Sequence, residues 1–202
     1  MVVHLSSGAV YGRQNMENTH RSEDDNLGGE LDSYGEAKLA VDRILHDAYS
    51  EGRINFQSPR LFAFAGPLLP LDAHFAVGNF LLDGLLGRPI SVNGNPNTLR
   101  SYMHPSDLIS SLFVIATKSQ YMNLNVGSEE SISMTNLAHL ISQMTTNQGV
   151  IFNNPGAKPS NYVPATTRLK SLLPGHTFLS LEESLSSWID WINPRNLPTK
   201  EG

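Results

Sequence analysis

Two side chains capable of proton chemistry, Tyr34 and Lys38, lie four residues apart at the predicted start of a helix. Residues i and i+4 share one face of a helix, so the phenol and the ammonium can face the same substrate. A free phenol titrates at about pH 10, and a nearby positive charge favours the phenolate. The pair is therefore suited to removing a proton from a hydroxyl group at neutral pH. Such pairs also occur by chance on exposed helices, so other segments of the chain are needed to distinguish a functional pair from an accidental one.

Further segments on both sides of the pair carry residues that could take part in the same chemistry. Ser7 stands at the end of a short apolar run, which predicts a buried strand, and it shortly precedes Val10-Tyr11-Gly12. Downstream lie Arg60-Leu61-Phe62 and then Gly66-Pro67. A third segment, Arg100 to Asp107, includes a tyrosine and a histidine just before a predicted helix. These segments add a hydroxyl group and two guanidinium groups to the phenol and the ammonium. All five groups lie in or next to predicted helices and strands.

Composition excludes several classes of protein. The chain has 202 residues, of which 40% are hydrophobic, and a formal net charge of -5, which argues against a nucleic-acid partner. The absence of cysteine excludes a disulfide scaffold and a cysteine-ligated zinc site, and the histidines show no metal-ligand spacing. No apolar run is long enough to span a bilayer, and the N-terminus does not resemble a signal peptide. We therefore predict a cytoplasmic protein without a metal or a membrane partner.

Helical periodicity alternates with short apolar runs, a pattern that predicts an α/β fold. Helices are predicted at 34–49, 75–86, 105–117, 135–144, 166–173 and 181–192. Strands are predicted at 1–5, 54–64, 89–95, 99–103, 121–126 and 150–152. Pro59 inside the second strand marks an edge, a bulge or a strand end. The polar stretch 13–32 predicts a long surface loop. Trp188 and Trp191, one turn apart, are interpreted as core residues.

These segments, in this order, resemble the extended short-chain dehydrogenase/reductase family, specifically its NAD-dependent nucleotide-sugar epimerases and dehydratases. Ser7 stands where that family keeps its catalytic Ser or Thr, and Tyr34 and Lys38 match its Tyr-x-x-x-Lys pair. The segments at Arg60 and Arg100 match two later parts of the family pattern. The similarity covers most of the chain.

The resemblance implies hydride transfer from a carbon of a nucleotide sugar to NAD or NADP. It makes Tyr34 the base, Lys38 its electrostatic partner and a donor to the cofactor ribose, and Ser7 the group that holds the substrate hydroxyl. Residues implied at the cofactor are Ser6, Tyr34, Lys38, Pro59 and Leu61. Residues implied at the substrate are Ser7, Asn79, Val92 and Arg100. A guanidinium suits phosphate, although Arg100 could instead form a surface ion pair, and Asn79 could be a polar cap over the core.

The sequence departs from the family pattern at three positions near these residues. Family 4,6-dehydratases carry an acidic pair directly after the catalytic Ser or Thr, where this chain has Gly8 and Ala9. Ala63 stands where many members have asparagine. Because neither Gly8 nor Ala9 can do acid-base work, we favour a nucleotide-sugar epimerase or keto-reductase. The alternatives are a 4,6-dehydratase of the same family and a non-catalytic interaction or regulatory module that retains the fold.

The family binds its dinucleotide through a Gly-x-x-Gly-x-x-Gly loop at a helix N-terminus, well before the catalytic Ser. No such spacing occurs in these 202 residues. We interpret the chain as the C-terminal half of a Rossmann-type parallel sheet, residues 1–66, plus a small mixed α/β substrate-binding region, residues 67–202, of which about 90–126 returns to the first part.

This interpretation has consequences for binding and assembly. The first strand should have an unpaired, apolar edge that invites another chain. We expect a truncated enzyme that is inactive alone and binds NAD weakly or not at all. Its expected partners are a nucleotide sugar and either a second copy in a homodimer or a chain that supplies the N-terminal half.

Overall fold

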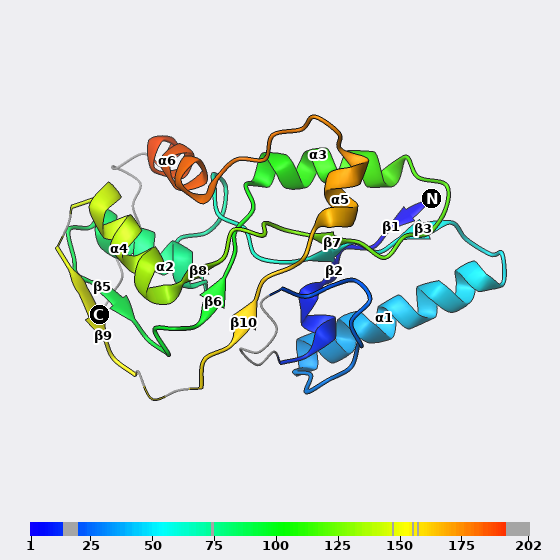
Figure 1. Ribbon diagram of the computed structural model, residues 1–202, viewed down its shortest axis with the longest axis horizontal. Coiled ribbons are helices and arrows are strands. Elements are labelled where there is room, and N and C mark those ends of the chain that lie inside the picture. Colours follow the sequence, from blue (N-terminus) through cyan, green and yellow to red (C-terminus); the bar gives the residue numbers. More distant parts are fainter. Residues whose placement is uncertain (14–19, 74, 147, 155, 157, 193–202) are drawn as a thin grey trace.

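A computed structural model describes residues 1–13, 20–73, 75–146, 148–154, 156 and 158–192. Its helices and strands form two lobes that lie side by side (Figure 1). The lobe that contains the N-terminus is built on parallel strands, and the other on packed helices with a short strand pair at its outer side. A membrane-crossing helix is not found anywhere in the described part of the chain.

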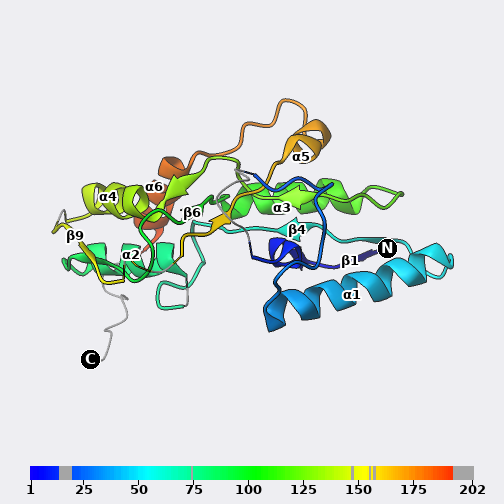
Figure 2. The same ribbon diagram turned by 60° about the horizontal axis from the view of Figure 1, so that its bottom comes forward.

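The first lobe is a parallel sheet between helices. All its strand pairs are parallel: β1 with β3, and β2 with β4, which pairs in turn with β7. Helix α1 covers one face of the sheet and α3 the other, as Figures 1 and 2 both show. The strands are β1 (Val2–Val3), β2 (Ser6–Ser7), β3 (Phe56–Gln57), β4 (Arg60–Leu61) and β7 (Asn125–Val126). The helices are α1 (Ser33–Ser50), α3 (Pro105–Ala116) and the short α5 (Thr167–Leu172), which contacts α3 and β7.

The second lobe packs three helices around a hydrophobic core, with one parallel strand pair at its edge. Its helices are α2 (Ala76–Leu85), α4 (Met134–Met144) and α6 (Leu181–Trp191), and its strands are β5 (Ile90–Val92) and β9 (Val150–Phe152). The side chains of Leu81, Leu137, Ile141 and Leu185 have no exposed surface, and Trp188 is 1% exposed. Contact between these side chains holds the lobe together.

A small mixed sheet joins the two lobes. Strand β6 (Leu99–Arg100) lies in the middle, parallel to β10 (Asn161–Tyr162) and antiparallel to β8 (Ile132–Ser133). In the parallel pair, Tyr162 is the register partner of Arg100. Side chains at paired positions project from the same face, so this pairing places a phenol beside a guanidinium between the lobes.

Local sequence explains how α1 begins and ends. The Asp32 side chain accepts a hydrogen bond from Gly35 N at 2.7 Å, which caps the first turn. Gly35 allows the helix to approach the 3₁₀ turn η1 (Gly8–Tyr11), because a Cβ there would lie 2.8 Å from Ala9 O. At the other end, Gly52 adopts a positive φ of 70°, as predicted for a helix stop.

Each of the six predicted helices is present, with bounds that differ by at most one residue. The predicted strand 54–64 is interrupted at Ser58-Pro59 and gives β3 and β4, as the proline indicated. Strands β2, β8 and β10 were not predicted, and the strand predicted as buried at 1–5 is only Val2–Val3, with Val2 43% exposed. The interpretation of Trp191 as a core residue was wrong: its side chain is 54% exposed because it lies at the end of α6, beyond the packed face that carries Trp188.

The elements do not divide cleanly at residue 66. Within the segment 90–126, α3 and β7 belong to the first lobe, while β5 pairs with β9 in the second. The predicted domain boundaries therefore stay a prediction, and the chain crosses between the lobes more than once.

Replacing Leu137 by Ala should lower the free energy of unfolding by about 2–5 kcal/mol, because the truncation leaves a cavity inside a fully buried core. Urea denaturation followed by circular dichroism measures the change. Ile44→Ala on α1, where the side chain is 66% exposed, is the control and should change stability by no more than about 0.5 kcal/mol. Equal losses in the two variants would contradict the described packing.

Candidate active site

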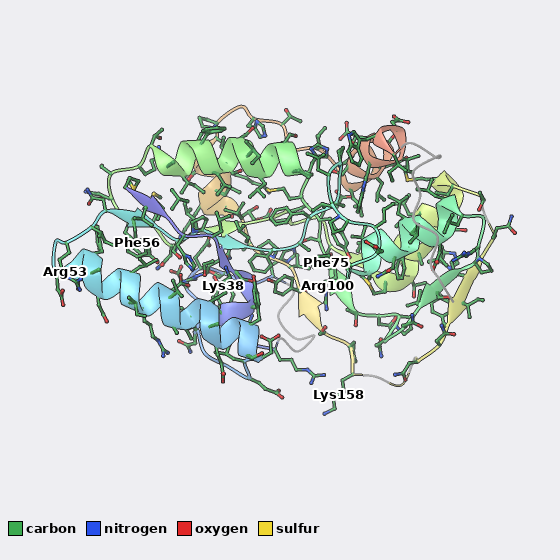
Figure 3. The ribbon with its side chains drawn as sticks, turned by 180° about the vertical axis from the view of Figure 1, so that it is seen from behind. Lys38, Arg53, Phe56, Phe75, Arg100 and Lys158 are labelled. Carbon is green, nitrogen blue, oxygen red and sulfur yellow. The ribbon has the colours of Figure 1, made fainter. Side chains whose placement is uncertain are left out.

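Tyr34 and Lys38 lie on α1 where the helix passes the end of strand β2. Lys38 Nζ donates a hydrogen bond of 2.7 Å to Leu5 O and lies 5.7 Å from the centroid of the Tyr34 ring. The Lys38 label in Figure 3 lies where α1 faces this strand. Tyr34 is 54% exposed, so its phenol is accessible to a ligand. The structure thus brings the predicted base and its predicted electrostatic partner together.

Ser7 ends strand β2 and caps η1, accepting a hydrogen bond from Ala9 N at 3.1 Å. It is only 5% exposed. Its hydroxyl also lies 3.3 Å from the hydroxyl of Tyr162 on β10. Tyr162 was not predicted as a site residue, and it connects Ser7 to the joining sheet.

The hydrogen-bond partners of the Tyr162 hydroxyl are neutral. Its hydroxyl donates to Leu61 O at 3.4 Å, and its ring packs on that of Phe62 with centroids 4.7 Å apart. Burial raises the pKa of Tyr162 to about 12, so the phenol keeps its proton at neutral pH. Leu61, predicted at the cofactor, therefore stands beside Ser7 and offers its carbonyl there. Pro59, also predicted at the cofactor, is buried between β3 and β4.

Asp42 fixes the helix to the strand one turn beyond Lys38. Its carboxylate accepts a hydrogen bond from Ser6 Oγ at 2.6 Å and another from Ser58 Oγ, and it lies 3.7 Å from His4 Nε2. Ser6, predicted at the cofactor, is 2% exposed and donates its hydroxyl inside the protein. Asp42 was missed, although Tyr34, Lys38 and Asp42 recur at four-residue intervals on one helix face.

Gly8 follows Ser7 where the dehydratases of the resembled family have an acidic residue. A Cβ at Gly8 would lie 2.6 Å from the ring of Phe62. Any larger side chain at this position would have to displace that ring, which also packs on Tyr162. The packing beside Ser7 therefore suits glycine and leaves no space for a carboxylate at position 8.

A pocket of about 850 Å³ lies beside β6 and α2 and contains the predicted substrate residues Asn79, Val92 and Arg100 in its lining. It also carries two acidic side chains and a second cation, Lys158, which Figure 3 labels together with Arg100. Its polar lining includes Asp72, Asn79, Asp83, Ser91, Asn93, Asn95, Thr98, Arg100 and Lys158. The volume is in the range of small-molecule sites.

Arg100 is held on neutral acceptors. Its guanidinium donates to Leu99 O at 2.7 Å, to Ser160 O at 3.4 Å and to Ser160 Oγ at 3.1 Å. Burial lowers the pKa of Arg100. No described carboxylate forms an ion pair with it, so the alternative of a surface ion pair was wrong. A buried guanidinium without a carboxylate partner retains its attraction for an anion.

The other two predicted substrate residues contribute differently. The side chain of Asn79 donates to Ala73 O at 2.8 Å and to Phe75 O at 3.1 Å, at the start of α2. Asn79 therefore stabilises the helix terminus while it lines the pocket. Val92 is 2% exposed, and its side chain belongs to the core, so the main chain is what it offers to the pocket.

The pocket and Ser7 are linked through the paired strands β6 and β10. Arg100 Cζ lies 5.9 Å from the centroid of the Tyr162 ring, and Tyr162 in turn contacts Ser7. A series of side-chain contacts therefore runs from Arg100, in the lining of the pocket, through Tyr162 to Ser7.

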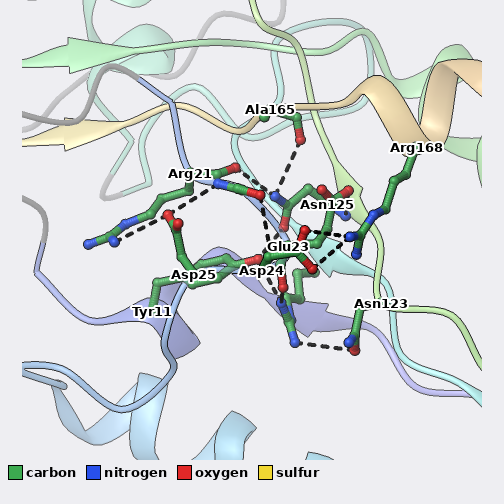
Figure 4. A network of polar contacts seen from close by, with 11 residues as sticks. Tyr11, Arg21, Glu23, Asp24, Asp25, Asn123, Asn125, Ala165 and Arg168 are labelled. Carbon is green, nitrogen blue, oxygen red and sulfur yellow. Dashed lines mark hydrogen bonds and ion pairs between the residues drawn. The ribbon is translucent and has the colours of Figure 1, made fainter.

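A buried polar network, shown in Figure 4, fixes residues 20–25 over the sheet. Arg60 donates to Tyr11 Oη at 2.7 Å, and that hydroxyl donates to Asn125 Oδ1 at 2.8 Å. Asn125 donates from Nδ2 to Arg21 O at 2.8 Å and from its main chain to Glu23 Oε1 at 3.1 Å. Arg60 is thus structural. Of the predicted loop 13–32, residues 14–19 lie outside the described residues.

Across the described residues, His, Asp and Glu side chains form no group of three or more that could hold a metal ion.

Comparison with known proteins places the chain in a family. The model of the NAD dependent epimerase/dehydratase family matches residues 1–127, and the chain belongs to that family. Its curated relatives include UDP-glucuronic acid decarboxylase 1 of Arabidopsis thaliana, 24% identical over 176 residues, which are 86% of this chain and 40% of the relative. The enzyme of the same name from Xenopus tropicalis is 24% identical over 78% of this chain and 38% of its own length. The chain thus spans about 40% of these relatives.

Solved structures share the fold. UDP-glucose 4-epimerase from Thermotoga maritima, solved with UDP-glucose, has a TM-score of 0.82 at 19% identity, covering 94% of this chain and 62% of that one. The dTDP-glucose 4,6-dehydratase of Bacillus anthracis, solved with NAD, has a TM-score of 0.80 at 17% identity, covering 94% and 60%. Identities this low establish the fold alone, which is the Rossmann-type α/β class predicted from the sequence.

Gly8→Ala should destabilise the protein by roughly 1–3 kcal/mol, because the added methyl group would meet the Phe62 ring and force it off Tyr162. Thermal or urea unfolding measures the loss. Gly94→Ala is the matched control, since a Cβ there meets nothing within 4 Å. A Gly8→Ala variant as stable as the control would show that space exists beside Ser7.

Burial, the largest cause, lowers the pKa of His4, while Asp42 raises it and Lys38 lowers it. The unfolded chain therefore takes up this proton first as the pH falls. The stability contributed by His4 is present above about pH 6.5 and is lost as the pH falls toward the folded pKa. His4→Gln should flatten the decline in unfolding free energy between about pH 7 and pH 5. His139→Gln, at an exposed position, should leave that decline unchanged; identical slopes for wild type and His4→Gln would refute the assignment.

Proposed function

We propose that this chain carries the nucleotide-sugar pocket and the proton-transfer groups of an NAD-dependent nucleotide-sugar epimerase or keto-reductase. The observation that supports it most is the series of contacts from Arg100, in the lining of the pocket, through Tyr162 to Ser7, on the strand against which the helix of Tyr34 and Lys38 packs. A nucleotide sugar has the matching order of parts: a base, two phosphates and a sugar hydroxyl.

The pocket suits the nucleotide end. Arg100 and Lys158 provide positive charge for a diphosphate, and a planar guanidinium matches phosphate oxygens. The polar side chains and main chain around Val92, Asn93 and Asn95 offer hydrogen bonds to a base and a ribose. With the phosphates at Arg100, the sugar projects toward Tyr162 and Ser7.

The α1 residues suit the reacting end. Tyr34 is exposed and would take the proton of the sugar hydroxyl, while the Lys38 ammonium, fixed on Leu5 O, favours the phenolate. Ser7 would hold the substrate hydroxyl once the substrate replaces its contact with Tyr162. NAD or NADP, when bound, accepts the hydride from the sugar carbon.

The residues present fit the nicotinamide-ribose end of that cofactor and not its pyrophosphate end. Lys38 Nζ makes one hydrogen bond here and has two further protons to donate to a ribose. By contrast, the glycine-rich loop that lets a backbone approach a pyrophosphate does not occur in these 202 residues. We therefore propose that dinucleotide binding requires additional polypeptide, joined to this chain or separate from it.

The packing at Gly8 favours epimerisation or keto-reduction over dehydration. Eliminating water from the keto-sugar calls for acid-base groups next to Ser7, and Gly8 and Ala9 provide none. Phe62 packs so closely on Gly8 that an acidic side chain at position 8 would have to displace the ring.

Isothermal titration with UDP and with dTDP tests the proposal without cofactor, because both cations proposed to bind the diphosphate, Arg100 and Lys158, belong to this chain. We expect saturable binding of at least one diphosphate, weakened about 10- to 100-fold by Arg100→Gln, since a charge-assisted hydrogen bond contributes about 1.5–3 kcal/mol. Arg53→Gln is the control, because Arg53 pairs with Glu51 at an exposed position. The assignment of the pocket would be refuted if neither UDP nor dTDP bound. It would also be refuted if the Arg100→Gln and Arg53→Gln variants bound the diphosphate with equal affinity.

A further inference from the structure

We propose that Tyr162 determines sugar specificity: it makes the subsite beside Ser7 uncharged, so that the site takes a nucleotide sugar with a neutral, hydroxyl-bearing sugar and discriminates against a uronic acid. This inference rests on the proposed function, because it concerns the sugar of the same nucleotide-sugar substrate.

Tyr162 stands where the sugar would lie. Its strand, β10, pairs in register with the strand of Arg100, and its hydroxyl lies 3.3 Å from Ser7 Oγ. The ring contacts that of Phe62, at 4.7 Å between centroids, and the Arg100 guanidinium, whose Cζ lies 5.9 Å from its centroid. A sugar attached to phosphates at Arg100 must therefore pass this phenol to reach Ser7.

Among the described residues, the groups that contact the Ser7 hydroxyl are neutral. The contacts that the structure gives its hydroxyl come from the Ala9 amide and the Tyr162 phenol, and the Phe62 ring closes the space over Gly8. The buried phenol stays protonated at neutral pH, so it can donate or accept a hydrogen bond without adding charge.

The cations Lys38 and Arg100 both donate hydrogen bonds to main-chain oxygens outside this subsite. Lys38 donates to Leu5 O on the α1 side. Arg100 lies against the face of the Tyr162 ring and is bound to Leu99 and Ser160, on the side of the nucleotide pocket. A carboxylate held at Tyr162 would lose its hydration and gain only neutral donors, which is unfavourable. A sugar hydroxyl at the same place gains a hydrogen bond at little penalty.

The relatives make this a sharp distinction. The eight curated relatives compared are all named as decarboxylases of UDP-glucuronic acid, a nucleotide sugar with a carboxylate, and they are 23% to 25% identical to this chain. The inferred specificity is for a sugar without the carboxylate, such as glucose. UDP-glucose and UDP-glucuronic acid can therefore be compared directly as ligands of this one protein.

The experiment is isothermal titration of UDP, UDP-glucose and UDP-glucuronic acid into the full chain and into three variants. Wild type should bind UDP-glucose at least about tenfold more tightly than UDP-glucuronic acid, in line with the energy of a desolvated charge that lacks a partner. Tyr162→Phe keeps the ring and should weaken UDP-glucose about fivefold to tenfold while changing UDP affinity less than about twofold. Tyr162→Arg should reverse the preference between the two sugars. Tyr121→Phe, which removes a phenol that bonds Asn123 instead, is the control and should change none of the affinities.

The outcomes separate this inference from the proposed function. If none of the three ligands binds, the proposed function fails and the inference fails with it. If UDP binds and wild type shows no preference between the sugars, or prefers UDP-glucuronic acid, the inference alone fails. Equal loss of UDP and UDP-glucose affinity in Tyr162→Phe would also overturn it, because a merely structural tyrosine would affect both ligands. Tyr162→Phe carries the test if Tyr162→Arg does not fold.

Discussion

Two hydrogen-bonded contacts between α1 and the beginning of strand β2 determine where the chemistry can occur. Lys38 donates to the carbonyl of Leu5, directly before the strand, and one turn later Asp42 accepts from Ser6, its first residue. Because both side chains project from one helix face and reach neighbouring residues, they fix the rotation of α1 as well as its distance from the sheet. Tyr34, one turn before Lys38, is thereby held near the strand end that carries Ser7. The carboxylate of Asp42 is only 14% exposed, so it would lose the hydrogen bonds from Ser6 and Ser58 with little replacement by water if the helix moved.

The helices of this fold follow from local sequence, and the joining sheet does not. Apolar periodicity, the Asp32 cap and the positive-φ glycine at position 52 contain enough information to place α1 within a residue at each end. Strands β8 and β10 are two residues long, too short for an alternating pattern to show. Their pairing with β6 joins segments far apart in the chain, and such pairing depends on tertiary packing. Trp191 illustrates the same limit, because helical spacing alone does not tell which turn of α6 extends past the core.

The residues of the candidate site also differ in whether the sequence could predict them. Tyr34 and Lys38 could be found from residue type and spacing, and the resemblance to a family added Ser7, Asn79, Val92 and Arg100, the last three of which meet in one pocket. Asp42 had a detectable signal in its spacing from Lys38. Tyr162 had none, because it reaches Ser7 across 155 positions of sequence through a strand that only the folded chain reveals. The Asp42–Ser6 contact likewise explains why Ser6, a predicted cofactor residue, has its hydroxyl engaged inside the protein.

The sheet of the first lobe ends at strands β1 and β2, whose other edge has no partner among the described residues. Val2 and Leu5 are 43% and 44% exposed there. An apolar, unpaired edge in a parallel sheet suits the addition of further strands. This edge, together with the absence of a glycine-rich loop in the sequence, supports a division of labour in which these residues recognise the nucleotide sugar and other residues hold the dinucleotide.

Titration of NAD into the chain, with and without saturating UDP, tests that division most directly. We expect no saturable binding up to millimolar NAD in either condition, because Lys38 alone cannot hold the cofactor without a pyrophosphate cradle. Binding of NAD with a micromolar dissociation constant would contradict the division and would show that these residues form a complete cofactor site.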